Sequence, residues 1–373
     1  MAPNDRTSLR KIFGEAFQRY VLPNTVADVD SSSIVNPYIP QDFFSGIYCD
    51  YVDTDELNAM ASIYKGHELV ALFMGLINFI DPYYAAFLSD PLMFQEIGDP
   101  SKDGKADKLK AIRIECLNKY PTLGAAPLSV CPIRSRAIVR LIQCGLLFLH
   151  AHEIAHIVLG HLDLLTDEFG MSVYEELHIV PLSLKESNIR KALELQADQS
   201  AALTSLHLFR QQLEKPSDEE EFKNADLLWS IAVESIFVLL ELVIDRKGIR
   251  PSVTHPSPFA RWLNVKLNVC EQAEEHGIRR LQLSETGLSP MKQVINWLTT
   301  NSLTEGRSLF PHNDANSAAG ELLSTWEAIR PYEGKLEHYR AIRGNRSESR
   351  PTMNVTQQAV AADAEDGGAD RQR

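Results

Sequence analysis

Apolar residues recur along most of this chain at the three- to four-residue spacing that is typical of amphipathic helices. Residues 13–132 follow this spacing with interruptions, and residues 146–159 and 227–244 are apolar on almost every side, which predicts buried helices. Shorter amphipathic stretches follow at residues 290–300 and 318–330. We therefore expect a mainly α (α+β) protein in which a small edge sheet or hairpin accompanies the helices.

Breaks in this pattern divide the chain into four regions. Residues 1–132 are an N-terminal, mainly helical region, and residues 133–270 form a central core that carries the motifs described below. Residues 271–343 are expected to form a C-terminal helical cover. Residues 344–373 are polar, with almost no large apolar side chains, and this composition predicts a disordered tail.

The apolar helix predicted over residues 146–159 contains His152, Glu153 and His156. Histidines four residues apart project from one face of a helix, so both imidazoles can reach a single metal ion. Burying these polar groups would be costly without a partner, and a metal ion is such a partner. In zinc hydrolases of this pattern the metal lowers the pKa of a bound water to roughly 7, and the glutamate takes its proton. The motif therefore predicts a zinc hydrolase site with Glu153 as the general base.

A catalytic zinc ion takes three protein ligands, so another residue must complete the set. On a continuing helix His161 would point away from the metal, and Asp163 would lie roughly 10 Å further along the axis. Glu194 and Asp198 lie four residues apart on a helix that is predicted to begin near Ser187. We predict that Glu194 is the third ligand and that Asp198 accepts the outer N–H of a ligating histidine, which fixes its tautomer.

Three blocks of sequence between about residues 140 and 265 follow one another in order. The first is His152-Glu153-x-x-His156-x-x-x-Gly160-His161, the second is ELQADQSA at residues 194–201, and the third is THPSPFAR at residues 254–261. Together they resemble the HExxHxxxGH, ExEADxxA and THPxxxxR segments of the HtpX and CAAX-prenyl-protease family of gluzincins. The resemblance implies a zincin-like helical metallopeptidase core, one Zn²⁺ per chain and hydrolysis of peptide bonds.

The chain departs from that family pattern at two positions of the second block. Gln196 stands where the family usually has a second glutamate, and Gln199 where it usually has arginine. Other compact bacterial gluzincins, the Lit-type and ImmA/IrrE-type proteases, share the same HExxH arrangement, so the subfamily stays open. Zincins usually place an edge strand beside the metal helix, and residues 126–131 or 173–181 are candidates for it.

His255 belongs to the third block and is our candidate for a second catalytic residue. In the resembling proteins this histidine lies near the cleft, where it could stabilise an oxyanion or cap the zinc ion in a latent state; the alternative is a structural role. Tyr174 and His178 are rival electrophiles of lower rank. Arg261 is expected to be an ion-pair partner, and Gly160 is expected to let a neighbouring element approach the metal helix closely.

The resembling proteases are integral membrane proteins, so the apolar runs need a separate test. Residues 227–244 contain Glu234 and Glu241, and acidic groups are disfavoured at the centre of a membrane span. Residues 69–80 are too short to cross roughly 30 Å of hydrocarbon. We expect no integral membrane span. The two glutamates could pair with Arg261 or Arg250 or line the cleft, and a solvated stripe is the simplest account.

The composition of the chain indicates which kinds of binding partner and which cellular compartment to expect. A net charge of −13 disfavours nucleic acid as a partner, because a nucleic-acid-binding protein needs a basic surface. The five cysteines have no CxxC pairing, and residues 1–19 have no apolar core of a secretory signal. These features favour the cytoplasm.

The sequence thus predicts a cytoplasmic zinc endopeptidase that acts on a protein or peptide substrate, and a regulatory partner protein is compatible with it. One alternative is a catalytically latent or inactive regulatory protein that keeps the zinc-protease fold. The intact Glu153 argues against an inactive protein, because binding alone does not need that carboxylate. The other alternative is a helical protein whose motif arose by chance.

Overall fold

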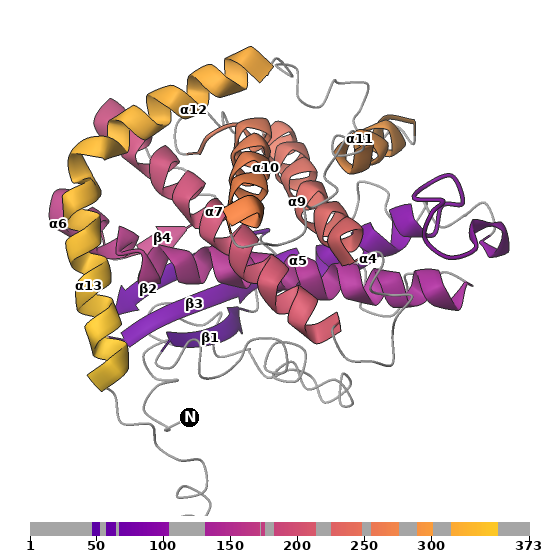
Figure 1. Cartoon of the computed structure of the whole chain (residues 1–373), viewed down its shortest axis with the longest axis horizontal. Helices are drawn as coiled ribbons and strands as arrows, with labels where there is room; N and C mark the ends of the chain where they lie inside the picture. Colours follow the sequence, from indigo (N-terminus) through magenta and orange to yellow (C-terminus); the bar gives the residue numbers. More distant parts are fainter. Residues whose placement is uncertain are drawn as a thin grey trace, which may run out of the picture.

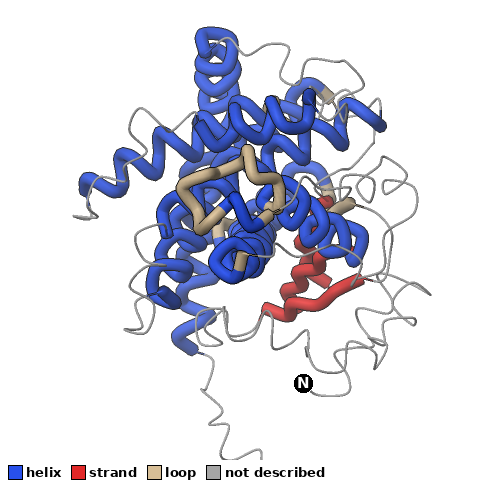
Figure 2. The backbone as a smooth tube through the Cα atoms, turned by 90° about the vertical axis from the view of Figure 1, so that its right-hand side faces the viewer, coloured by secondary structure: helices blue, strands red, loops and turns tan. Residues whose placement is uncertain are grey.

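The structure is a computed structural model of the chain, and it is mainly helical with one small sheet. Figure 1 shows long helices that cross one another beside the sheet, and Figure 2 shows the strands gathered at one side of the helical body. The residues that the structure describes are 47–52, 57–64, 67–103, 131–171, 173–175, 183–213, 225–247, 255–275, 289–300 and 315–349.

The sheet has four strands in the order β1-β3-β2-β4. Three strands come from the N-terminal region, β1 (Ile47–Val52), β2 (Ala59–Tyr64) and β3 (His67–Phe73), and the short edge strand β4 (Val173–Glu175) comes from the core. Strand β1 pairs with β3 in parallel, whereas β2 pairs with β3 and β4 in antiparallel fashion. The expectation of a mainly helical N-terminal region is therefore wrong for residues 47–73, whereas an edge strand within residues 173–181 is confirmed.

The apolar helices pack into one continuous core beside this sheet. Helix α4 (Met74–Leu88) follows β3 directly, and the long helix α5 (Pro132–Val158) packs against α4, α7 (Leu184–Leu213) and α9 (Ala225–Lys247). Helices α10 (Pro258–Glu275) and α11 (Ser289–Thr300) pack on α9. The core includes side chains from residues 57 to 298, so it joins the N-terminal region to the central helices.

Two C-terminal helices run around the outer edge of this body (Figure 1). Helix α12 (Ala315–Ile329) packs against α7 and α10, and the short 3₁₀ turn Arg330–Tyr332 connects it to α13 (Glu333–Ser349). Helix α13 packs against α5 and against α6 (His161–Phe169). The helices predicted near residues 290–300 and 318–330 are thus confirmed. Helix α13 also extends into the stretch for which a disordered tail is predicted, and residues 350–373 lie outside the described part.

Arg134 fixes the start of α5 against the end of α4. It is fully buried and donates hydrogen bonds to the carbonyl oxygens of Leu88, Phe94 and Ile97, at 2.9, 3.0 and 3.0 Å. Its charge is balanced by Asp103, whose Oδ2 lies 2.9 Å from Nε. A buried cation needs such a set of acceptors, so these contacts hold the register of the helix that carries the HExxH motif.

The two glutamates of α9 lie differently from our expectation. Glu234 is buried rather than part of a solvated stripe, and it accepts hydrogen bonds from Ser230 Oγ at 2.7 Å and from the Met291 N–H at 3.0 Å. Glu241 is half-buried. Burial raises the pKa of Glu234 from 4.5 to about 7, although both hydrogen bonds oppose the shift. Its contact with Met291 joins α9 to the first turn of α11.

Among the described residues, α5 rather than α9 is long and apolar enough to cross a membrane. In its most apolar window, 83% of the residues are buried inside the protein. Core helices of water-soluble proteins pass the same test, so α5 is only weak evidence for a membrane span.

Candidate metal centre

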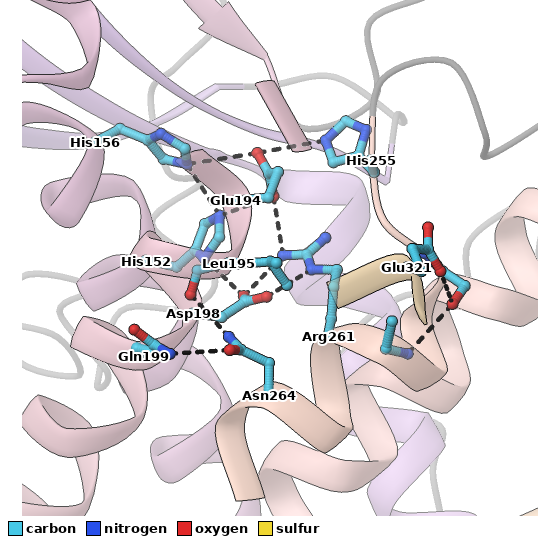
Figure 3. A network of polar contacts seen from close by, with 12 residues as sticks. His152, His156, Glu194, Leu195, Asp198, Gln199, His255, Arg261, Asn264 and Glu321 are labelled. Atoms are coloured by element: carbon cyan, nitrogen blue, oxygen red, sulfur yellow. Dashed lines mark hydrogen bonds and ion pairs between the residues drawn. The ribbon is translucent and has the colours of Figure 1, made fainter. Parts of the chain in front are cut away.

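The three predicted metal ligands meet where α5 crosses α7. His152 and His156 project from α5 one turn apart, and Glu194 projects toward them from α7 (Figure 3). Their exposed fractions are 2%, 0% and 0%, and the helices around them are apolar. The structure thus brings Glu194 next to two histidines that precede it by 42 and 38 residues in the chain, and the three groups could hold a metal ion.

The distances within this group test whether a metal ion fits. His152 Nε2 and His156 Nε2 lie 3.2 Å apart. Glu194 Oε2 lies 3.4 Å from His152 Nε2, and Glu194 Oε1 lies 3.5 Å from His156 Nε2. Ligand atoms about 2.1 Å from a tetrahedral ion are separated by about 3.4 Å. The separation of the two nitrogens is close to this value, and each nitrogen lies at about this distance from one oxygen of the Glu194 carboxylate, so the three side chains could hold one ion. Two nitrogens with one carboxylate are a donor set that Zn²⁺ accepts.

Asp198 lies on α7 one turn after Glu194 and contacts the outer side of His152. Its Oδ1 is 3.0 Å from His152 Nδ1, as the sequence predicts, so His152 can donate from Nδ1 while Nε2 faces the metal position. Arg261 donates to the same carboxylate from Nε and Nη2, at 2.8 and 2.9 Å. Its Nη2 also lies 3.1 Å from Glu194 Oε2, so the predicted ion-pair role of Arg261 is confirmed.

Glu194 is ionised in spite of its burial. Burial alone would raise the pKa of this carboxyl, but the charges of His255 and Arg261 and hydrogen bonds from His152 and His255 hold it well below its usual range. The pKa of His156 is also lowered, chiefly by burial, and this favours the neutral imidazole that a metal requires. The protonation states of these two ligands are thus already those of a metal-binding site.

His161 lies against His156, not away from it. The prediction assumed a continuing helix, but α5 ends at Val158 and Gly160 takes a left-handed conformation with φ +77°. His161 then begins α6, and its Nδ1 lies 3.1 Å from His156 Nδ1. Its Nε2 lies 3.0 Å from Gln196 Oε1. Burial lowers the pKa of His161 to about 3, so this ring is neutral.

Gly160 permits the turn between α5 and α6, and it also permits α13 to lie close to this turn. A Cβ atom added there would lie 2.5 Å from Tyr339 Cβ on α13. The expectation that Gly160 lets a neighbouring element approach the metal helix is therefore confirmed, and that element is α13. Asp163, the other residue set aside as a ligand, instead accepts a hydrogen bond from Arg343 Nε of α13 at 2.7 Å.

His255 and His156 lie on opposite sides of Glu194 Oε1 (Figure 3). The Nε2 atom of His255 is 3.5 Å from Glu194 Oε1, and the ring is buried. The turn that carries it is fixed by Ser257, whose N–H and Oγ donate to the Glu321 carboxylate of α12 at 3.1 and 2.7 Å. Ser257 Oγ also accepts from the Ala260 N–H at 3.2 Å, which caps α10.

Glu153 faces a small apolar cavity beside the metal position. Its polar lining residues are Asn58, His152, Glu153 and Arg261. The apolar lining comes from Leu57 and Ala59 near the start of β2 and from side chains of α4, α5 and α9, among them Leu76, Ile80, Phe148, Ile236, Leu239 and Leu240. Glu153 itself is buried. The cavity is thus placed to receive an apolar group next to the general-base candidate.

Several contacts of the site were not predicted from the sequence. Gln196 and Gln199, noted only as departures from a family pattern, both hold the site: Gln196 contacts His161, and Gln199 Nε2 donates to Asn264 Oδ1 at 2.9 Å. Asn264 in turn donates to the Leu195 carbonyl oxygen at 2.9 Å, which ties α10 to the ligand helix. The side chains of Tyr174 and His178, and residues 126–130, lie outside the described part of the chain.

His67-Glu68, a second His-Glu pair in the chain, lies at the start of strand β3, and Glu68 forms an ion pair with Arg343.

Comparisons of the chain with protein-family models, with curated proteins and with solved structures found no match. The resemblance to the HtpX and CAAX-prenyl-protease family therefore stays a prediction.

Proposed function

We propose that this protein is a zinc-dependent endopeptidase of the gluzincin type. The observation that carries the proposal is the buried group of His152, His156 and Glu194. Its two Nε2 atoms lie 3.2 Å apart, and the two Glu194 oxygens lie 3.4 and 3.5 Å from them, so the three side chains could hold one metal ion. The neighbouring Glu153 supports hydrolysis rather than metal storage, because it adds a carboxylate that the ligand set does not need.

Bound Zn²⁺ would supply Lewis acidity, which lowers the pKa of water and polarises a carbonyl group. In this proposal Glu153 takes the proton of the attacking water and passes it to the leaving amine. Asp198 and Arg261 hold His152 in the tautomer that leaves Nε2 free for the metal. We assign His255 to the developing oxyanion, because it is the histidine beside Glu194 that is not a ligand.

The apolar cavity favours a substrate with an apolar side chain next to the cleaved bond. Apart from the polar end formed by Asn58, His152, Glu153 and Arg261, its walls are aliphatic and aromatic, so an apolar group loses no hydrogen bonds to water there. A protein or peptide in the cytoplasm is the proposed substrate. The net charge of −13 disfavours nucleic acid, and Cys49, Cys131 and Cys144 form no disulfide.

The first test combines metal analysis with a peptide assay. Wild-type protein is expected to contain about one zinc ion per chain and to cleave a fluorogenic peptide library. Glu153→Gln should keep the zinc ion and lose at least about 100-fold in kcat, because it keeps the shape but not the base. His156→Ala and Glu194→Ala should lose the metal. Wild-type protein without zinc, or a Glu153→Gln variant with full activity, would refute the proposal.

A latent form of the same protease is the second candidate, and the burial of the site favours it. His152, Glu153, His156, Glu194 and His255 all expose 5% or less of their surface, so a peptide must displace part of the surrounding structure to reach them. If His255 restrains the closed state through Glu194, His255→Ala will raise the basal activity. If His255 serves the oxyanion, the same variant will lower kcat and leave zinc content unchanged.

A further inference from the structure

The ring nitrogens of His152 and His156 that face away from the metal position contact different kinds of residue. The outer nitrogen of His152 faces the charged Asp198, at 3.0 Å. The outer nitrogen of His156 faces another histidine, His161, at 3.1 Å, and no carboxylate lies in that contact. Both His156 and His161 are fully buried, so water does not replace this interaction.

The contacts of Gln196 fix where the protons of this chain lie. Its Oε1 lies 3.0 Å from His161 Nε2 and 3.5 Å from Arg340 Nη2, which is a donor only. The atom that faces both is therefore the amide oxygen, an acceptor. His161 must then carry its proton on Nε2, which leaves Nδ1 as the acceptor in a neutral ring.

The same logic extends to the ligand. Because His161 Nδ1 accepts, His156 donates from Nδ1, and the lone pair of His156 lies on Nε2. That nitrogen is the one that lies 3.2 Å from His152 Nε2 and 3.5 Å from Glu194 Oε1. The chain of contacts thus selects the tautomer that a metal ion requires.

We infer that His161 and Gln196 are positioning residues that hold His156 for metal binding, through a neutral relay His156–His161–Gln196 that Arg340 of α13 anchors. The inference rests on the proposed zinc site. Arg340 also donates from Nε to the Leu159 carbonyl oxygen at 3.4 Å, so α13 holds both the turn after α5 and the end of the relay. A neutral relay orients the ligand without adding negative charge to a site that already contains Glu194 and Asp198.

The test measures zinc affinity by competition with a chelator, together with the visible absorption spectrum of the Co²⁺-substituted protein. His161→Phe keeps a flat ring but removes both hydrogen bonds, and we expect zinc affinity to fall about 10- to 100-fold and the Co²⁺ spectrum to change. His161→Gln, whose amide can accept from one partner and donate to another, should restore affinity to within a few-fold of wild type.

The matched control is His150→Phe. His150 is also buried on α5, but it contacts the Leu146 carbonyl oxygen at 2.8 Å and is not among the predicted metal ligands. We expect its zinc affinity and Co²⁺ spectrum to equal those of the wild type. Gln196→Leu, at a half-buried position, is the second variant for the case that His161→Phe does not fold, and we expect it to weaken zinc binding in the same direction.

The outcomes separate this inference from the proposed function. If wild type binds zinc and hydrolyses peptides while His161→Phe and Gln196→Leu keep wild-type affinity and spectra, the relay is refuted and the proposed function stands. Equal losses in His161→Phe and His150→Phe would also refute it, since they would indicate general damage to α5. A wild-type protein that takes up no metal would refute the proposed function and the relay together.

Discussion

Arg261 lies between two buried carboxylates, Asp198 and Glu194, and balances the charge of both. Removing it leaves two buried negative charges without their cation. We predict that Arg261→Met lowers the free energy of unfolding of the metal-free protein by about 3–5 kcal/mol, measured by urea titration in the presence of a chelator.

Arg210 provides the comparison, because it pairs with Asp226 at 2.8 Å but with exposed fractions of 24% and 39% for the two side chains. Arg210→Met should cost less than about 1 kcal/mol, since water screens this pair. Equal losses of unfolding free energy in Arg261→Met and Arg210→Met would show that burial does not make the Arg261 ion pairs more stabilising than an exposed pair.

Glu234 predicts a pH-dependent stability that is separate from the metal site. Its pKa is raised from 4.5 to about 7 by burial, so between these pH values the folded state binds more protons than the unfolded state. The stabilisation is complete below pH 4.5, declines as the pH rises, and is lost above pH 7. The difference amounts to about 3 kcal/mol.

Glu234→Gln should remove this part of the pH dependence, so its stability relative to wild type should rise from pH 5 to pH 8 in urea unfolding. Glu271→Gln, at an exposed position of α10, should follow the wild-type curve. Parallel curves for wild type and Glu234→Gln would contradict the prediction.

At the scale of residues, the site was largely predictable, because ligand chemistry requires particular side chains at helical spacing. His152, His156, Glu194 and Asp198 lie where the motif places them. The position of His161 was not predictable in the same way. It depends on where α5 ends, and the sequence HIVLGHL is compatible with both a continuing and a broken helix.

At the scale of elements, the junction of α5, α6 and α13 depends on Gly160. Any side chain there meets a backbone conformation with φ +77° and the Cβ atom of Tyr339 at 2.5 Å. We predict that Gly160→Ala destabilises the protein by about 2–5 kcal/mol, as the sum of left-handed strain and overpacking. Thermal or urea unfolding measures this loss.

A variant at Gly170 measures the left-handed strain without the overpacking. Gly170 also has a left-handed conformation, φ +71°, but no atom lies within 4 Å of an added Cβ. Gly170→Ala should therefore cost only about 1–2 kcal/mol. If the two alanine variants lose the same stability, the close approach of α13 does not add to the cost of a side chain at position 160.

Strands β1, β2 and β3 were not predicted from the sequence, in contrast to the edge strand β4. Strand β3 (HELVALF) runs directly into α4 (MGLINFI), so a single apolar run contains a strand and a helix, and its periodicity distinguishes neither. Leu69, Val70, Ala71 and Leu72 are all buried, which removes the alternation that would identify a strand with one solvated face. Burial on both faces is a property of the assembled sheet, which local patterns do not encode.

At the scale of the whole molecule, α12 supports the candidate site through Glu321. This carboxylate holds the turn of His255 by accepting from Ser257 N–H and Oγ. We predict that Glu321→Ala costs about 1–3 kcal/mol of stability and lowers peptide hydrolysis, whereas zinc content stays at the wild-type level because no ligand is moved.

Glu327 lies on the same helix with an exposed side chain, and Glu327→Ala should change neither quantity. Loss of zinc in Glu321→Ala would contradict the separation of the His255 turn from the ligand set. Calorimetry, metal analysis and the peptide assay together provide the three readouts.

The two C-terminal helices therefore support the site through one side chain each, α12 through Glu321 and α13 through Arg340. A ribosome makes residues 315–349 after all three metal ligands, so a nascent chain contains the ligands before it contains these supports. On the proposed function, we therefore expect a chain that ends before residue 315 to hydrolyse peptides more slowly than the full chain, because both supports are missing.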